Sequence, residues 1–266
     1  MSSQRAIGVF DSGLGGLTVL RELTLAMPHE DFIYLGDVAR LPYGTKSPGV
    51  VTRYSERCLN FLLGQGVKMV VVACNTATAN ALPQLRRDSP VEVLGVIEPG
   101  VRAALAVPQR KRVMVLATSS AVRSEAYPKE FRKWDAQVRV DQVACPLFVP
   151  LAEEGWFDHP VTVSVAKEYL QSAEIGKDDV IVMGCTHYPL LEPSLRRVLG
   201  ERTALVHGGE YLAQEVRASL ASRSELNPSM ARGKLIFFST DVIPSGLPLV
   251  SQLFGDQTAF GIVDLE

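Results

Sequence analysis

Val70-Val-Val-Ala-Cys-Asn-Thr76 is a stretch that returns in similar form as Val180-Ile-Val-Met-Gly-Cys-Thr186. Each copy begins with a short apolar run, typical of a strand that is buried on both faces of a parallel sheet. A cysteine, small polar residues and a helical pattern then follow. The repetition predicts two similar α/β halves that face one another, although the match is short and coincidence is the alternative.

Apolar runs of the same kind recur along the chain, and helical segments follow them. Strands are expected at Ala6–Phe10, Phe32–Leu35, Lys68–Ala73, Val91–Ile97, Arg112–Ala117, Arg139–Val143, Asp179–Met183, Thr203–Val206 and Lys234–Phe238. Apolar residues at spacings of three and four predict helices at Gly16–Ala26, Gly49–Leu63 and Thr162–Gln171. This alternation predicts an α/β fold with mainly parallel sheets and helices on both faces.

Two glycine-containing stretches are the best candidates for the places where the chain crosses between the halves. They are Pro99-Gly100 and His207-Gly208-Gly209. We therefore expect one domain from residues 1–98 plus 208–266, carrying Asp11 and Cys74. The second domain would comprise residues 99–207 and carry Cys185. A chain of 266 residues is long enough for one large domain or two ordinary ones.

The overall composition excludes several classes of partner. The net charge is −2 and the pI about 6.1, so no global field attracts nucleic acid or an anionic membrane. Residues Met1 to Arg5 lead directly into an apolar run that Asp11 ends, without the pattern of a signal peptide. The sequence also lacks a run of about twenty apolar residues. We expect a cytoplasmic protein.

Polar residues gather where the expected strands end, which is where open α/β sheets bind ligands. They are Asp11-Ser12-Gly13, Gly36-Asp37, Pro42-Tyr43-Gly44, Cys74-Asn75-Thr76, Glu153 and Cys185-Thr186-His187. The glycine-rich stretch from Asp11 to Gly16 does not match a dinucleotide fingerprint, because Thr18 stands at the third glycine position. It can hold a carboxylate at a helix N-terminus, or it can simply permit a sharp turn.

The four cysteines are Cys58, Cys74, Cys145 and Cys185, and none forms a C-x-x-C pair. A metal or redox motif is therefore not indicated. A single cysteine at a strand end is usually a small packing residue. Cys74 and Cys185, however, stand in matching contexts that suggest chemistry, whereas Cys58 and Cys145 are expected to pack. His187 lies close enough in sequence to reach Cys185, its alternative being a core histidine.

Two thiols that face one another suit the racemisation of an amino acid, which removes the α-proton from one face and returns a proton to the other. Pyridoxal enzymes do this with a Schiff-base lysine. Lys46 is the only lysine near a strand-end motif, so the sequence does not support pyridoxal. Without a cofactor, fixed donors must stabilise the carbanion. Suitable donors are Ser12, Asn75, Thr76, Thr186 and the amides of Tyr43 and Gly44.

At these residues the sequence resembles the glutamate racemase family, within the cofactor-independent aspartate/glutamate racemase superfamily. The similar segments are Ile7–Thr18, Pro42–Gly44, Ala73–Ala77, Cys145–Pro150 with Glu153, and Gly184–Leu191. The resemblance implies two α/β domains with an active site in the cleft between them, and neither cofactor nor metal. It also implies a role in supplying D-glutamate for peptidoglycan. Family members are often homodimers, and some bind DNA gyrase.

The resemblance also implies a role for each site residue. Cys74 would exchange the proton of D-glutamate, supported by Asp11. Cys185 would exchange that of L-glutamate, supported by Glu153 and His187. The residues that would hold the substrate are Asp11, Ser12, Tyr43, Gly44, Asn75, Thr76, Thr186 and His187.

The chain departs from the family pattern at two places. Ser120-Ala121 replaces a common Gly-Thr, which removes a hydroxyl near the expected substrate carboxylate, and we expect Thr118 or Ser119 to compensate for it. His207-Gly208 replaces an Asp-Ser type of pair. Both changes bear on binding strength and regulation.

Two rival functions stay open at this stage. In a cysteine-nucleophile amidase, Cys185, His187 and Glu153 would act together, which leaves Cys74 without a role. A binding or regulatory protein would keep the site without turnover.

Overall fold

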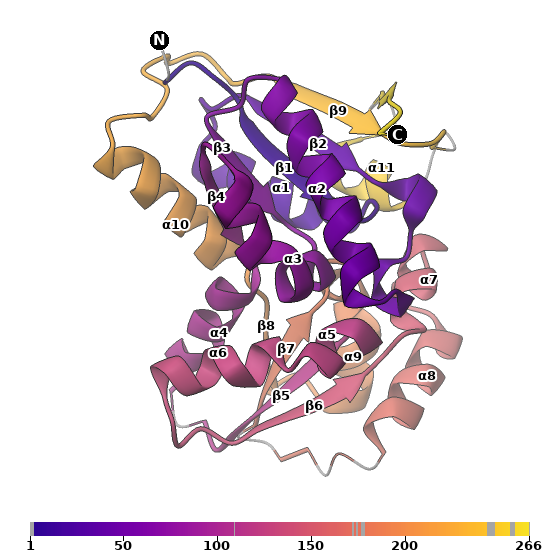
Figure 1. Ribbon diagram of the computed structural model, residues 1–266. Helices are drawn as coiled ribbons and strands as arrows, with labels where there is room; N and C mark the ends of the chain where they lie inside the picture. The colour runs from indigo at the N-terminus through magenta and orange to yellow at the C-terminus, as the bar shows by residue number, and fades with distance from the viewer. Residues whose placement is uncertain are drawn as a thin grey trace.

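A computed structural model of the protein describes residues 3–108, 110–171, 173, 175–176, 179–243, 248–255 and 259–265. Its strands form two sheets, each at the centre of its own lobe (Figure 1). Every strand pair in both sheets is parallel. The predicted α/β class with parallel sheets is confirmed.

The first lobe contains a sheet of six strands in the order β10-β9-β2-β1-β3-β4. The strands are β1 (Ile7–Asp11), β2 (Phe32–Gly36), β3 (Met69–Val72), β4 (Glu92–Gly95), β9 (Leu235–Ser239) and β10 (Gly261–Ile262). Helices α1 (Leu17–Ala26), α10 (Gly209–Ser222) and α11 (Pro248–Phe254) pack on one face. Helices α2 (Pro48–Gly64) and α3 (Asn75–Asp88) pack on the other. Strands β1, β2 and β3 are wholly buried, which explains their unbroken apolar sequences.

The second lobe contains a sheet of four strands in the order β6-β5-β7-β8. The strands are β5 (Arg112–Ala117), β6 (Val140–Ala144), β7 (Asp179–Gly184) and β8 (Ala204–Val206). Helices α4 (Ile97–Ala106), α5 (Ser119–Ser124) and α6 (Ala126–Trp134) cover one face. Helices α7 (Phe148–Glu153), α8 (Pro160–Leu170) and α9 (Glu192–Leu199) cover the other.

The two sheets repeat one topology. In the first, β3 lies between β1 and β4; in the second, β7 lies between β5 and β8. The order β2-β1-β3-β4 therefore corresponds strand by strand to β6-β5-β7-β8. The segments before Cys74 and Cys185 occupy equivalent central positions, as the short internal repeat predicted.

All of the expected strands are present, with ends within two residues of the prediction. Strand β10 was not expected, because its two residues are exposed and carry no apolar pattern. Pro99-Gly100, one of the two candidate crossings, does not form a loop. Both residues lie in the first turn of α4, where proline is tolerated because its missing N–H would have no helical partner.

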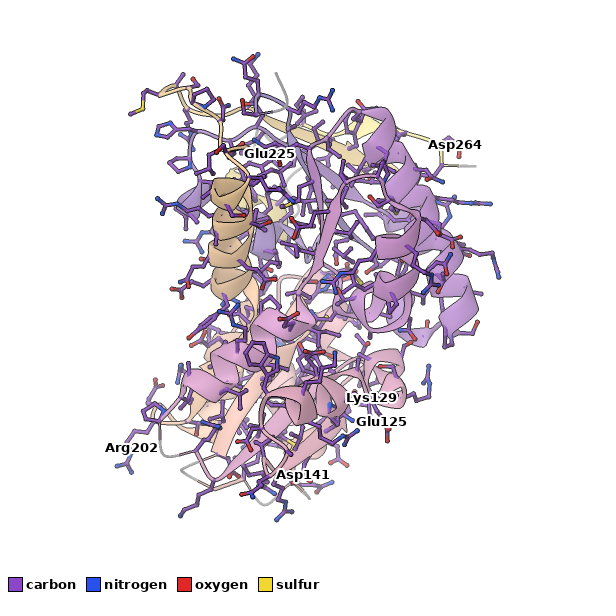
Figure 2. All side chains as sticks on the ribbon, turned by 60° about the vertical axis from the view of Figure 1, so that its left-hand side comes forward. Glu125, Lys129, Asp141, Arg202, Glu225 and Asp264 are labelled. Atoms are coloured by element: carbon purple, nitrogen blue, oxygen red, sulfur yellow. The ribbon has the colours of Figure 1, made fainter. Side chains whose placement is uncertain are left out.

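The two crossings between the lobes lie side by side. A Cβ atom on Gly208 would stand 2.5 Å from the carbonyl oxygen of Val96 and 2.9 Å from the nitrogen of Gly100. Only glycine fits there. Residues after the second crossing return to the first lobe: Figure 2 places Glu225 and Asp264 on it, and Asp141 and Arg202 on the other. The division at residues 98 and 207 into two domains stays a prediction.

Among the described residues, no helix combines the length and the apolar character needed to span a bilayer.

A buried ion pair ties the edge of the first lobe together. Lys68 Nζ lies 2.6 Å from Glu30 Oε2 and donates to the carbonyl oxygens of Ser3 and Glu225 at 2.7 and 2.8 Å. Both side chains are at most 3% exposed. The pair therefore joins the start of the chain to the segment after α10.

Lys68→Met should lower the free energy of unfolding by about 3–5 kcal/mol, because it leaves the Glu30 charge buried without its counter-ion. Adding Glu30→Gln should recover part of the loss. The control is Arg197→Met, which breaks the exposed pair with Asp158 and should cost less than about 1 kcal/mol. Urea unfolding measures all three. If Lys68→Met and Arg197→Met lower the free energy of unfolding equally, the buried pair of Lys68 and Glu30 contributes no more to stability than the exposed pair.

Candidate active site

A cavity lies between the lobes, where the carboxyl ends of both sheets meet. Its polar wall consists of Ser12, Tyr43, Gly44, Thr45, Cys74, Asn75, Thr76, Thr118, Ser119, Cys185, Thr186 and His187. Its apolar wall consists of Leu41, Pro42, Pro146, Val149 and Pro150. The segments that follow β1, β2, β3, β5, β6 and β7 supply this lining, so two separate sheets build one site.

Most residues expected at the site line this cavity. The exceptions are Asp11 and Glu153, which lie behind it and contact lining residues instead. Thr45 and Leu41 line the cavity but were not predicted. Thr118 and Ser119 were considered only as substitutes for a missing hydroxyl. They follow β5 directly, so the rule that singled out the other strand ends also points to them.

Cys74 follows β3 and is the N-cap of α3. The amide of Ala77 donates to its sulfur at 3.4 Å, and the thiol lies 3.5 Å from the hydroxyl oxygen of Ser12. The side chain is almost fully buried. Burial, with the negative charge of Asp11 second, raises the pKa of Cys74 to about 12. At neutral pH Cys74 is therefore a thiol, a proton donor.

Asp11 is a fully buried carboxylate at the end of β1. Its Oδ2 accepts hydrogen bonds from the amides of Gly13 and Gly16 at 3.2 and 3.0 Å. Its Oδ1 accepts one from the hydroxyl of Thr186, in the other lobe, at 3.5 Å. Burial raises its pKa, against the positive charge of His187 and the backbone donors. Asp11 thus holds the glycine-rich turn and links it to the Cys185 segment.

Cys185 has a different neighbourhood. Its sulfur lies 3.8 Å from Nδ1 of His187, whose Nε2 lies 3.2 Å from Oε1 of Glu153. Burial by itself would lower the pKa of His187, but contacts with Cys185 and Glu153 outweigh it and raise the pKa to about 10. His187 is therefore protonated at neutral pH. The sulfur of Cys185 therefore lies beside a positive imidazolium.

The glycine-rich turn meets the Cys185 segment in close contact. A Cβ on Gly15 would stand 2.4 Å from Nδ1 of His187 and 2.5 Å from Oγ1 of Thr186. Thr18 donates from its hydroxyl to the carbonyl oxygen of Thr186 at 3.0 Å. Gly15 must therefore be glycine, because the other lobe approaches its backbone too closely for a side chain.

The segment of Cys185 does not lead directly into a helix, although the repeat predicted that it would. A 3-10 turn, Tyr188–Leu191, separates it from α9.

A buried network holds the loop that carries Tyr43 and Gly44. The hydroxyl of Tyr43 donates to Oδ2 of Asp37 at 2.5 Å, and Asp37 Oδ1 accepts from Arg40 and Thr240, each at 2.9 Å. Burial raises the pKa of Tyr43 well above its ordinary value, so the hydroxyl stays a donor. The expected site residues did not include Asp37, although its position after β2 was a usable signal.

Hydroxyl groups from both lobes meet where the chain departs from the family pattern. The hydroxyls of Thr76 and Thr118 lie 2.8 Å apart. The hydroxyl of Ser120 accepts from Asn80 at 3.3 Å, and Ser120 does not line the cavity. Thr118 and Ser119 carry hydroxyl groups on this part of the cavity wall, and their compensation for Ala121 stays a prediction.

The other two cysteines, Cys58 and Cys145, are fully buried and line no part of the cavity, in agreement with a packing role. Within the described ranges, no group of three or more His, Cys, Asp or Glu side chains has the arrangement of a metal site. The cavity instead offers one thiol that retains its proton and one sulfur beside a positive charge. Such a pair can give a proton to a bound molecule and take one from it.

Iodoacetamide should therefore alkylate Cys185 on the order of tenfold faster than Cys74 at neutral pH, because thiolate is the reactive form and the raised pKa of Cys74 keeps that thiol protonated. The two side chains are similarly buried, at 7% and 4% exposure, so accessibility does not explain a difference. Peptide mapping by mass spectrometry gives both rates, with Cys58 and Cys145 as unreactive controls. His187→Gln should slow the reaction at Cys185. Faster labelling of Cys74 would contradict the raised pKa of that thiol.

Comparison with known proteins agrees with this geometry. The family model described as Asp/Glu/hydantoin racemase matches residues 13–216. A glutamate racemase of Geobacter metallireducens is 47% identical, covering 94% of this chain and 92% of its own length. One of Listeria monocytogenes is 41% identical, covering 89% of each.

Solved structures agree as well. Glutamate racemase from Thermus thermophilus, in complex with β-chloro-D-alanine, has a TM-score of 0.87 at 42% identity, covering 100% of this chain and 99% of that one. The enzyme from Francisella tularensis, in complex with D-glutamate, has a TM-score of 0.91 at 32% identity, covering 99% of each. An aspartate racemase of Picrophilus torridus, at 14% identity and a TM-score of 0.60, shares the fold alone. The chain belongs to the Asp/Glu/hydantoin racemase family, and its similarity is to the glutamate racemases within it.

Proposed function

We propose that the protein is a glutamate racemase, which interconverts L-glutamate and D-glutamate with Cys74 and Cys185 as its two acid/base groups. The observation that carries the proposal is that two cysteines from equivalent strand ends line one cavity in unlike electrostatic surroundings. In the proposed complex the α-carbon lies between the two sulfurs. The product serves peptidoglycan synthesis, in the cytoplasm.

The two sulfurs take opposite roles in the conversion of L-glutamate. Cys185, beside the imidazolium of His187, acts as the base, and Cys74, whose raised pKa keeps its proton, acts as the acid. Cys185 then removes the α-proton of L-glutamate: the C–H bond breaks, its electron pair stays on carbon, and an S–H bond forms. Cys74 donates its proton to the opposite face of the carbanion. D-glutamate results, and the two cysteines have exchanged states. D-glutamate then reacts in the opposite sense.

The carbanion needs stabilisation that two thiols cannot supply, because a general acid or base contributes only about 10²–10⁴-fold. Donors held by the fold supply the rest through electrostatic preorganisation. Asn75 and Thr76 stand at the N-terminus of α3, and Ser12 and Thr186 face the same cavity. Among the described lining residues there is no lysine, so the cavity offers no Schiff-base partner for pyridoxal.

Glutamate is proposed as the substrate over aspartate because the relatives that match along nearly the whole chain are glutamate racemases. The aspartate racemase shares only the fold. A homodimer and an interaction with DNA gyrase stay predictions from the resemblance.

Cys74→Ser and Cys185→Ser should each abolish racemisation, because a serine hydroxyl is far too weak an acid to exchange the α-proton. The loss should reach at least about 10²–10⁴-fold in kcat. Polarimetry with purified protein, L-glutamate and no added pyridoxal measures it. Cys145→Ser is the matched control and should retain activity. If either active-site variant racemises at the wild-type rate, the two-base assignment is wrong.

In heavy water, L-glutamate should become D-glutamate labelled with deuterium at the α-carbon, because the incoming proton comes from a thiol that exchanges with solvent. NMR and chiral chromatography follow the label and the configuration. Aspartate, tested in parallel, should react much more slowly. A trapped thioester, or ammonia released from glutamine, would instead favour the amidase built on Cys185, His187 and Glu153.

A further inference from the structure

Tyr127 connects the surroundings of the two cysteines, although it does not line the cavity. It lies on α6 in the second lobe and is 1% exposed. Its hydroxyl donates to Oδ1 of Asn75, the residue after Cys74, at 2.7 Å. Its ring packs against Gly184, the residue before Cys185, where a Cβ would stand 3.0 Å from Cε2.

The hydrogen bond decides which way the Asn75 amide points. A carboxamide has an accepting oxygen on one branch and a donating NH2 group on the other. Because the oxygen is bound by Tyr127, the NH2 group is left for the cavity that Asn75 lines. An amide turned the other way would present an oxygen to an anionic substrate and repel it.

Nothing else about Tyr127 suggests direct chemistry. Burial raises the pKa of its hydroxyl well above its ordinary value, so the group stays protonated and keeps donating. The contact crosses from one lobe to the other, and it therefore also ties the end of β3 to the end of β7 beside both cysteines.

We propose that Tyr127 is a positioning residue for the racemase: its hydroxyl holds the amide of Asn75 with the NH2 group directed at the substrate. This inference rests on the proposed function. It concerns a hydrogen bond that the Asn75 amide makes to glutamate in the ground state as well as in the transition state, and not which groups exchange the proton. Loss of the hydroxyl is therefore expected to act on KM more than on kcat.

Tyr127→Phe keeps the ring against Gly184 and removes only the hydroxyl. The KM for L-glutamate should rise about tenfold, with a smaller change in kcat. Asn75→Ala should also raise KM, and the double variant should equal Asn75→Ala alone, because Tyr127 acts through Asn75. The control is Thr162→Val, which removes a buried hydroxyl that donates to the carbonyl oxygen of Trp156 at 2.7 Å, away from the cavity. It should lower Tm and leave the kinetic constants unchanged.

The outcomes separate the two proposals. If the wild-type protein racemises no glutamate, the proposed function fails first. If it does, and Tyr127→Phe keeps the wild-type KM, the inference about Tyr127 is overturned. Additive losses in the double variant would overturn it too, because the hydroxyl would then act independently of Asn75. If Tyr127→Phe lowers Tm as Thr162→Val does but leaves KM unchanged, the Tyr127 hydroxyl has only a structural role.

Discussion

The shape of the cavity depends on the buried carboxylate of Asp11. A buried charge is tolerated only when hydrogen bonds satisfy it, and Asp11 receives them from Gly13, Gly16 and Thr186. These donors come from both lobes, so one carboxylate shapes the glycine-rich turn and joins it to the segment of Cys185. After burial, which is the larger cause, the same charge also raises the pKa of the Cys74 thiol. A single interaction thereby acts on both the geometry of the site and the protonation of one of its sulfurs.

A repeated topology yields two unequal thiols. Strands β3 and β7 hold equivalent positions, yet the turns around them differ. Cys74 caps a helix near a carboxylate, whereas Cys185 adjoins an imidazolium that Glu153 supports. Titratable groups whose surroundings separate their proton affinities can serve as acid and base at one pH. A reaction that takes a proton from one face and returns one to the other requires such a pair.

Local sequence patterns were sufficient to predict most of the strands and the class of fold. Buried parallel strands are apolar without interruption, so β5 was predicted to the residue and the other central strands nearly so. The structure differs from the prediction where the sequence pattern is weak or fits two kinds of structure. Strand β10 has only two exposed residues, and Pro99-Gly100 suits the first turn of a helix as well as a loop. The polar strand ends identified most of the lining, while Thr45 and Leu41 carried no such signal.

The sequence by itself determined the strands, the class of fold, the two candidate cysteines and the polar residues beside them, because these depend on residues that are neighbours along the chain. Only the tertiary structure decided how those residues act on one another. Asp11 contacts Thr186 and Tyr127 contacts Asn75 across two lobes, and Glu153 reaches His187 from another helix. Burial and long-range contacts set proton affinities and side-chain orientations, and neither can be read from the order of residues along one strand.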